Sequence, residues 1–319
     1  MSPDMEKAKE RISNYSNQGR LLEEKLKVAL DESLEWLPEG GKEALVSDIL
    51  DATTDDKLHG IFFNIFTILA WPALLESETS DVRIPEEDIS PPETRDQDMQ
   101  DYCLKRDNYC CVITGAMDTA TYFERFRPAG FANVQLQIAH IMPYSISHWN
   151  ESAMTTLWDA LCRYFPAVHE ARIKAGSINA LVNSLSNSLS MQCHASQALS
   201  LFGFTLKATD RPNVYKTVLF PTCPHLVQEF LPDEIEFKPA PRTGTEEDEE
   251  LELPSKELLD CHYRLAHILN ACGYDMAHRL NEYWCLWQRV DRENVINMLD
   301  EKIDMSDYLN SEIWELPDS

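Results

Sequence analysis

Two acidic stretches that contain proline divide this chain of 319 residues and most limit how it can fold. Residues 77–97 read SETSDVRIPEEDISPPETRDQ, and PAPRTGTEEDEELELP occurs beyond residue 222. Proline cannot continue a helix or donate to a strand, and repelling carboxylates resist burial, so both stretches have the character of linkers or solvated loops. The sequence therefore predicts four parts: 1–97, 98–222, 223–255 and 256–319.

The flanks and the middle of the chain differ in hydrophobic periodicity. Apolar residues recur at helical spacing over residues 5–36 and again from about 256 to 300. NVQLQIAH at 133–140 alternates as a strand does, YCCVITG at 109–115 is predicted as a short strand, and LSLFGFTLKAT and PNVYKTVLF are predicted as a hairpin that turns at 208–213. The predicted fold class is α+β, with a small module that contains a β-hairpin between helical N- and C-terminal regions.

Charge also separates the middle from its flanks. The formal net charge is −26, yet residues 101–220 hold ten Lys and Arg against eight Asp and Glu, so the rest of the chain carries −28. A chain this acidic is not expected to bind nucleic acid over its whole surface, because phosphate binding normally needs a basic footprint. The near-neutral middle is thereby set apart from its acidic helical flanks, for which a protein partner is expected.

Cysteine usage and hydropathy predict an intracellular protein without a membrane span. Nine irregularly spaced cysteines, with Cys110 and Cys111 adjacent, are expected to be free thiols. The apolar stretch 60–76 is interrupted by Asn64 and Pro72 and is expected to be a buried helix. The N-terminus lacks the apolar core of a signal peptide. The sequence does not distinguish between a cytoplasmic and a nuclear location.

His140 stands where a predicted strand breaks into a loop. It follows LQIA and precedes Ile-Met-Pro, which cannot comfortably prolong a strand. Such a histidine is a satisfied core residue, a metal ligand or a catalytic base. Phosphodiester hydrolysis needs a neutral imidazole to deprotonate water, a divalent cation to neutralise developing charge and an amide that holds the imidazole in its tautomer. A strand that ends in histidine, an Asn-rich turn and a second histidine follow in an order that favours this chemistry.

Several motifs of the middle segment resemble the HNH nuclease domain found in many fungal proteins. They are RDNYCCVITG, LQIAHIMPYS, WDALCRYFP, INALVNSLSNSLSM and LFGFTLKATDRPNVYKTVLF, and they cover roughly residues 100–222. The resemblance implies a ββα-metal fold that hydrolyses DNA with one divalent cation, Mg²⁺ first and Mn²⁺ or Zn²⁺ as alternatives. It also implies that His140 is the general base, that Asn187 orients it and that His194 binds the metal.

The sequence departs from the HNH pattern at three positions. Ala139 precedes the general base where many relatives carry Asp or His, and Cys110 stands where relatives usually carry arginine. The usual spacing from Asn187 places the metal ligand at Ser196 instead of His194. A second hypothesis therefore stays open, in which a catalytically inactive HNH-like module serves as a binding or protein-interaction domain. Whether the chain is an enzyme is left open by its sequence.

Overall fold

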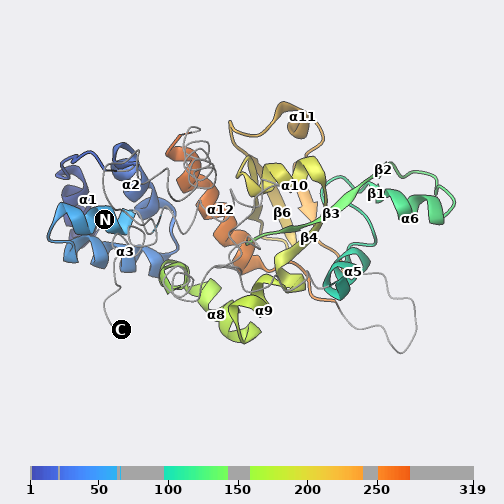
Figure 1. Ribbon diagram of the computed structural model, residues 1–319, viewed down its shortest axis with the longest axis horizontal. Helices are drawn as coiled ribbons and strands as arrows, with labels where there is room; N and C mark the ends of the chain where they lie inside the picture. Colours follow the sequence, from blue (N-terminus) through green and yellow to red (C-terminus); the bar gives the residue numbers. More distant parts are fainter. Residues whose placement is uncertain are drawn as a thin grey trace, which may run out of the picture. The chain divides into compact units, whose positions relative to one another are not determined.

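Helices dominate the first of two units into which the chain divides, and small sheets form in the second (Figure 1). The computed structural model describes residues 2–20, 22–62, 65, 97–142, 159–239 and 251–273. The first unit comprises residues 1–89, 149–170 and 267–319, and the second comprises residues 90–148 and 171–266. The mixture of helices with small sheets confirms the predicted α+β class.

Short helices make up the described N-terminal part of the first unit. They are α1 (Pro3–Ser13), the 3-10 turn η1 (Glu23–Lys25), α2 (Leu26–Trp36) and α3 (Glu39–Asp51). Ser2 caps α1, because its hydroxyl accepts a hydrogen bond from the Met5 backbone amide. Apolar residues at helical spacing, among them Ile12, Leu30 and Leu45, are buried where the three helices pack together.

A loop interrupts the helix that the sequence predicts over residues 5–36. The Glu23 carboxylate accepts hydrogen bonds from three backbone amides and one hydroxyl, those of Gln18, Gly19, Arg20 and Tyr15. Burial alone would raise the pKa of Glu23, but these hydrogen bonds outweigh burial and lower the pKa to about 2. The prediction of continuous helical spacing was wrong here, because a side chain satisfies backbone amides that a helix would otherwise use.

A segment between two strands of the second unit folds with the helices of the first. Arg163 forms an ion pair with the buried carboxylate of Asp48 in α3, and the Tyr164 hydroxyl donates to the same carboxylate at 2.9 Å. Gly41 permits this approach, since a Cβ there would lie 2.0 Å from the Tyr164 carbonyl oxygen. The surrounding segment, 149–170, belongs to the first unit, although the sequence predicts it within the middle module.

The described part of the second unit contains three small sheets. The strands β1 (Met117–Asp118) and β2 (Asn133–Val134) pair in parallel, and β3 (Leu136–His140) and β4 (Ser188–Gln192) pair antiparallel. The third sheet has the antiparallel order β5 (Phe204–Ala208), β6 (Val214–Leu219) and β7 (Glu234–Glu236). The predicted hairpin is confirmed as β5 and β6, and the predicted strand over 133–140 is confirmed with a break at Gln135.

Several short helices accompany these sheets. They are α5 (Gln97–Arg106), α6 (Thr119–Glu124), α9 (Ile178–Val182), the 3-10 turn η3 (Leu185–Asn187), α10 (Cys193–Ser200) and α11 (His225–Gln228). Among them, α5, α6 and α10 pack directly on strands. Two more helices, α8 (Pro166–Ala175) and α12 (Lys256–Ala271), have residues in both units. The C-terminal helix is confirmed as far as Ala271, and the rest of its predicted range, 274–300, lies outside the described residues.

Two segments differ from their predicted structure. Residues 109–115 form a turn instead of a strand, in which the Gly115 amide donates to the Cys111 carbonyl at 2.8 Å and Gly115 adopts a φ of 70°. Residues 234–236, predicted within an acidic loop, form β7 beside β6, because Ile235 within the strand and Phe237 just after it are buried. The predicted linker at 77–97 lies outside the described residues except for its last residue.

The predictions about cysteines and about the apolar stretch can be compared with the structure in the described ranges. All eight cysteines in the described ranges are free thiols, as predicted. Among the described residues, no helix combines the length and the hydropathy needed to cross a membrane. In the apolar stretch 60–76, Ile61, Phe62 and Ile65 are buried, and most of the remainder lies outside the described residues.

Candidate functional site

The antiparallel ribbon of β3 and β4 brings His140 and Asn187 together. His140, the last residue of β3, lies opposite Ser188, the first residue of β4. The Ile141 backbone amide donates to the Asn187 carbonyl at 2.8 Å, which extends the ribbon by one more pair. His140 is 4% exposed and Asn187 is 0% exposed, so both residues lie inside the fold. Two residues 47 positions apart in sequence are therefore neighbours.

The Asn187 side chain holds the backbone that follows His140. Its Oδ1 accepts from the Met142 amide at 2.7 Å, and its Nδ2 donates to the Met142 carbonyl at 2.9 Å and to the Val182 carbonyl at 2.9 Å. Both amide hydrogens and the amide oxygen are thereby used, which is the requirement for burying such a group without loss of free energy. Asn187 therefore positions His140 through the main chain two residues further on.

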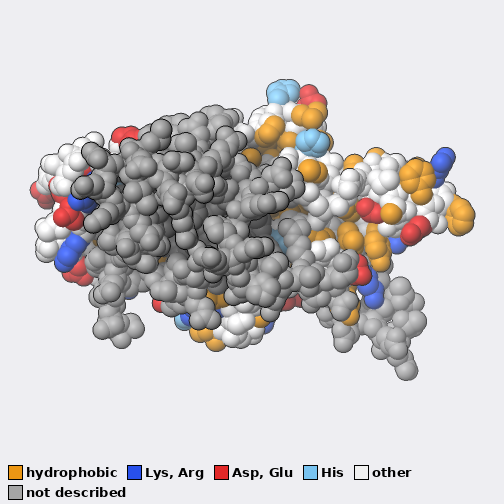
Figure 2. Space-filling view, in the orientation of Figure 1, with side chains coloured by type: hydrophobic (Ala, Val, Ile, Leu, Met, Phe, Trp, Pro, Cys, Tyr) orange, Lys and Arg blue, Asp and Glu red, His pale blue; other side chains and the backbone are white. Residues whose placement is uncertain are grey.

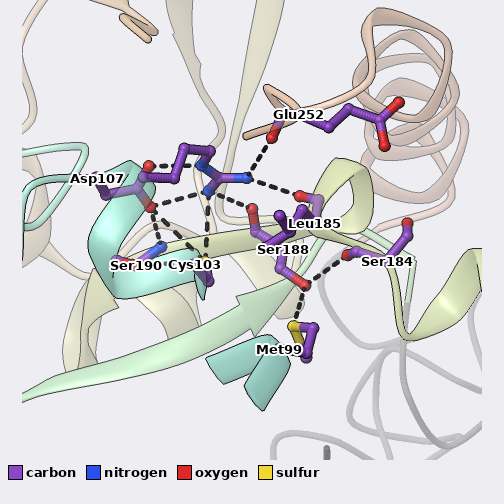
Figure 3. A network of polar contacts seen from close by, with 9 residues as sticks. Met99, Cys103, Asp107, Ser184, Leu185, Ser188, Ser190 and Glu252 are labelled. Carbon is purple, nitrogen blue, oxygen red and sulfur yellow. Dashed lines mark hydrogen bonds and ion pairs between the residues drawn. The ribbon is translucent and has the colours of Figure 1, made fainter. Parts of the chain in front are cut away.

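Arg106, at the end of α5, is a buried cation that holds the backbone on both sides of Asn187. Figure 3 shows the polar network around this guanidinium, which includes Asp107, Leu185 and Ser188. Its guanidinium donates to the carbonyls of Leu185 and Ser188, each at 2.7 Å. It also makes a two-pronged contact with the Asp107 carboxylate, at 2.7 and 2.9 Å. Burial alone would lower the pKa of Arg106, but Asp107 outweighs burial and raises it, so the side chain stays charged.

Asp107 joins this cation to the outer edge of β4. Its Oδ2 accepts from the Ser190 backbone amide at 2.9 Å, and the Ser190 carbonyl accepts from the Val112 amide at 2.9 Å. Two residues further along β4, the Gln192 amide donates to the Cys111 sulfur at 3.4 Å. The segment 107–112 thus occupies the edge of β4 that β3 does not cover. Few backbone groups are left unpaired at that edge of the described ribbon.

The sequence placed Arg106 and Asp107 in a motif but assigned them no role. The signal that could have identified them is an adjacent Arg-Asp pair at the end of a helix, just before a short apolar run. A buried arginine is costly unless it is paired, so such a dipeptide points to an internal ion pair. The hydrogen-bond partners of Arg106 could not be predicted from the neighbouring sequence, because Leu185 and Ser188 lie 79 and 82 residues away.

The structure does not bring His194 beside His140. His194 is exposed in the first turn of α10, whereas Ala195, Ser196, Ala198 and Leu199 of that helix are buried. It follows the end of β4 that lies opposite Leu136, four pairs away from the pair of His140 and Ser188. Four residue steps along a strand span about 14 Å. The assignment of His194 as the metal ligand stays a prediction.

The two faces of the ribbon carry different chemistry. His140 shares its face with Ser188 and Ser190, since residues directly opposite each other in an antiparallel pair lie on one side. The hydroxyls of these serines lie 3.4 Å from the Met99 sulfur and 3.5 Å from the Cys103 sulfur of α5. Burial raises the pKa of Cys103 to about 11, so this thiol is protonated near neutral pH.

The described residues do not by themselves supply a complete ligand set for a divalent cation. Ala139, buried on the face opposite to His140, has no ligand atom, and Ser196 is buried in α10, which packs on β3 and β4. Within the part of the chain that the structure describes, no group of three or more His, Cys, Asp or Glu side chains could hold a metal ion. The exposed His194 does not complete a ligand set with His140.

Comparison with protein-family models, with curated proteins and with solved structures finds no match to this chain.

Proposed function

We propose that β3, β4 and α10 form an HNH-like module that acts on phosphodiester bonds of DNA. The observation that supports this proposal best is the combination of element order and placement. Two antiparallel strands are followed by a helix that packs on both, His140 ends the first strand, and Asn187 fixes the turn after it. This element order supports the proposal, because the resemblance to HNH nucleases implies a ββα-metal fold.

In this proposal His140 is the general base and Asn187 is a positioning residue. A neutral imidazole accepts the proton of a water molecule as that water attacks phosphorus, and it must be held in one orientation to do so. Asn187 and Arg106 supply that orientation by fixing Met142 and Ser188, which flank the end of the ribbon. A divalent cation, when bound, would neutralise charge on the phosphate.

The test is nicking of supercoiled plasmid by the full-length protein, with Mg²⁺, Mn²⁺ or Zn²⁺ supplied separately. Replacement of a general base lowers such rates by about 10²- to 10⁴-fold, so His140→Ala should leave almost no nicking. His225→Ala is the matched control, because His225 is an exposed histidine on α11 and should leave the rate unchanged. Equal nicking by wild type and His140→Ala, or none by wild type with any cation, would refute the proposal.

A second candidate is an HNH-like module without cleavage that serves as a binding domain. The specific observations that favour it are the position of His194, exposed beyond the opposite end of the ribbon, and Ala139 at a position that cannot coordinate. Titration calorimetry with Mn²⁺ separates the two candidates. A single micromolar site that disappears in His194→Ala would argue against the inactive module, and absence of cation binding would favour it.

A further inference from the structure

Residues 117–134 form an arm that leads into β3. It consists of β1, α6 and β2, and is closed at its base by the Met117 amide, which donates to the Ala132 carbonyl at 2.8 Å. Asp118 caps α6 by accepting from the Thr121 amide at 3.1 Å. Figure 1 shows the arm extending beyond the first residues of β3, on the side away from α10. It belongs entirely to the second unit.

The helix of this arm ends in a turn that glycine normally makes. The Arg127 amide donates to the Tyr122 carbonyl and the Phe126 amide to the Phe123 carbonyl, which is the pair of hydrogen bonds of a Schellman motif. Phe126 and Arg127 both adopt a left-handed φ of 57°. Non-glycine side chains are disfavoured there, so local folding gives no reason for a phenylalanine at this position.

Packing does not explain Phe126 either. Its side chain is 93% exposed, and the neighbouring Phe123 and Phe131 are 52% and 40% exposed. Figure 2 shows hydrophobic and basic side chains gathered at the free end of the arm. A ring that is neither buried nor in a favourable backbone conformation, with two more exposed rings nearby, indicates a contact surface.

The guanidinium groups of both arginines in the arm lie over aromatic rings. Arg125 lies over the Tyr109 ring at 5.3 Å, and Arg127 lies over the Phe123 ring at 5.1 Å. Neither has an ion pair within the described residues, although the chain carries a net charge of −26. Other described arginines do pair with Asp or Glu: Arg11, Arg20, Arg106, Arg163, Arg211 and Arg264.

We propose that the arm binds unpaired bases of a nucleic acid strand. The exposed rings of Phe123, Phe126 and Phe131 stack on base faces, and the guanidinium groups of Arg125 and Arg127 contact the phosphates. Bases inside a duplex have their faces covered by their neighbours, so exposed rings of this kind select single-stranded or distorted segments. This inference rests on the proposed function, which makes a nucleic acid the partner. It adds that the single-stranded form is bound and names the residues that bind it.

The test uses the full-length protein and a fluorescein-labelled 20-nucleotide oligothymidylate, with anisotropy read in EDTA so that no cleavage occurs. Phe126→Gly removes the ring and suits the left-handed backbone, so it should weaken binding about tenfold or more without lowering the melting temperature. Arg125→Gln combined with Arg127→Gln should reduce the slope of log K against log salt by about 1.4. Leu226→Ala and Arg211→Gln alter exposed residues outside the arm and should leave binding unchanged.

Several results would overturn this inference. They are no binding by wild type, equal binding by Phe126→Gly, and binding of a blunt 20-base-pair duplex as tight as that of the single strand. Arm-dependent binding of polyglutamate with the same affinity would point to an acidic protein partner instead.

Plasmid nicking by the same variants separates the two proposals. If the wild type nicks plasmid and Phe126→Gly still binds the single strand, the role of the arm is refuted and the proposed catalysis is not. If the wild type binds through the arm but does not nick plasmid, the proposed catalysis is refuted and the role of the arm is not. His140→Ala is expected to bind oligothymidylate as wild type does, because His140 lies outside the arm.

Discussion

At the scale of single residues, buried polar side chains hold the end of β3 in place. Asn187 and Arg106 together donate to or accept from the backbone of Met142, Val182, Leu185 and Ser188. These contacts join turns that are far apart in sequence, and each one satisfies a backbone group that would otherwise be buried alone. The position of His140 is therefore determined by polar contacts as much as by apolar packing.

Asn187→Leu tests this positioning role. Leucine has a similar volume but cannot replace the three hydrogen bonds, so it should lower the free energy of unfolding by about 2–4 kcal/mol. Urea unfolding followed by circular dichroism measures the change. Asn183→Leu is the control, because the Asn183 side chain makes a single exposed hydrogen bond within α9 and its turn. Equal destabilisation by both variants would contradict the role assigned to Asn187.

At the scale of elements, His262 links α12 to β5 and α10. Its Nδ1 lies 2.9 Å from the Thr205 hydroxyl of β5, and its Nε2 lies 3.1 Å from the Leu199 carbonyl of α10. Because a carbonyl only accepts, Nε2 carries the hydrogen and Nδ1 accepts from the hydroxyl. The ring also stacks on Phe202 with a centroid distance of 4.8 Å. A neutral imidazole satisfies all of these contacts.

This histidine should make stability depend on pH. Burial lowers the pKa of His262 to about 4, even though its hydrogen bond to the Leu199 carbonyl raises it, compared with 6.5 for an unperturbed histidine. Between these two values the unfolded chain binds a proton that the folded chain does not. The contribution of His262 is therefore complete above pH 6.5, declines as the pH falls, and is lost by about pH 4.

His262→Gln provides the measurement. Glutamine offers one donor and one acceptor but no titrating group, so the variant should lose less stability than wild type between pH 7 and pH 4. The difference should approach 3 kcal/mol over that range, at about 1.4 kcal/mol per pH unit. Parallel pH profiles from urea unfolding of the two proteins would show that His262 does not titrate as described.

At the scale of the whole molecule, the chain passes between its two units four times. Residues 149–170 lie in sequence between β3 and β4, yet they fold with the N-terminal helices. The carboxylate of Asp48 and the close approach of Tyr164 to Gly41 account for this placement within the first unit. Part of the segment that separates His140 from Asn187 in sequence, residues 149–170, thus belongs to the first unit, whereas the ribbon belongs to the second.

Substitutions at two adjacent glycines test that placement. Gly41→Ala should destabilise the first unit by about 1–3 kcal/mol, because its Cβ would lie 2.0 Å from the Tyr164 carbonyl oxygen. Gly40→Ala lies in the same helix and would place its Cβ 3.3 Å from the Pro166 side chain, so a change within about 1 kcal/mol is expected. Thermal unfolding of both variants gives the comparison. Gly41→Ala as stable as Gly40→Ala would show that segment 149–170 does not pack on α3.

The sequence by itself determined those elements whose signal lies within a few residues. The strand that ends at His140 and the hairpin of β5 and β6 were predictable, because alternation of polar and apolar residues is a local property. Helical spacing likewise indicated α2 and α12. The juxtaposition of His140 with Asn187 came from a resemblance of motifs, and the ribbon register agrees with it.

Only the tertiary structure decided how distant residues use their polar groups. The break before α2 depends on one carboxylate, Glu23, and the turn at 109–115 depends on hydrogen bonds to β4 rather than on its apolar composition. Periodicity does not reveal the exposure of His194 or the burial of Arg106, whose hydrogen bonds join it to residues 79 and 82 positions away. Such contacts are set by packing of the whole chain, and local patterns do not contain them.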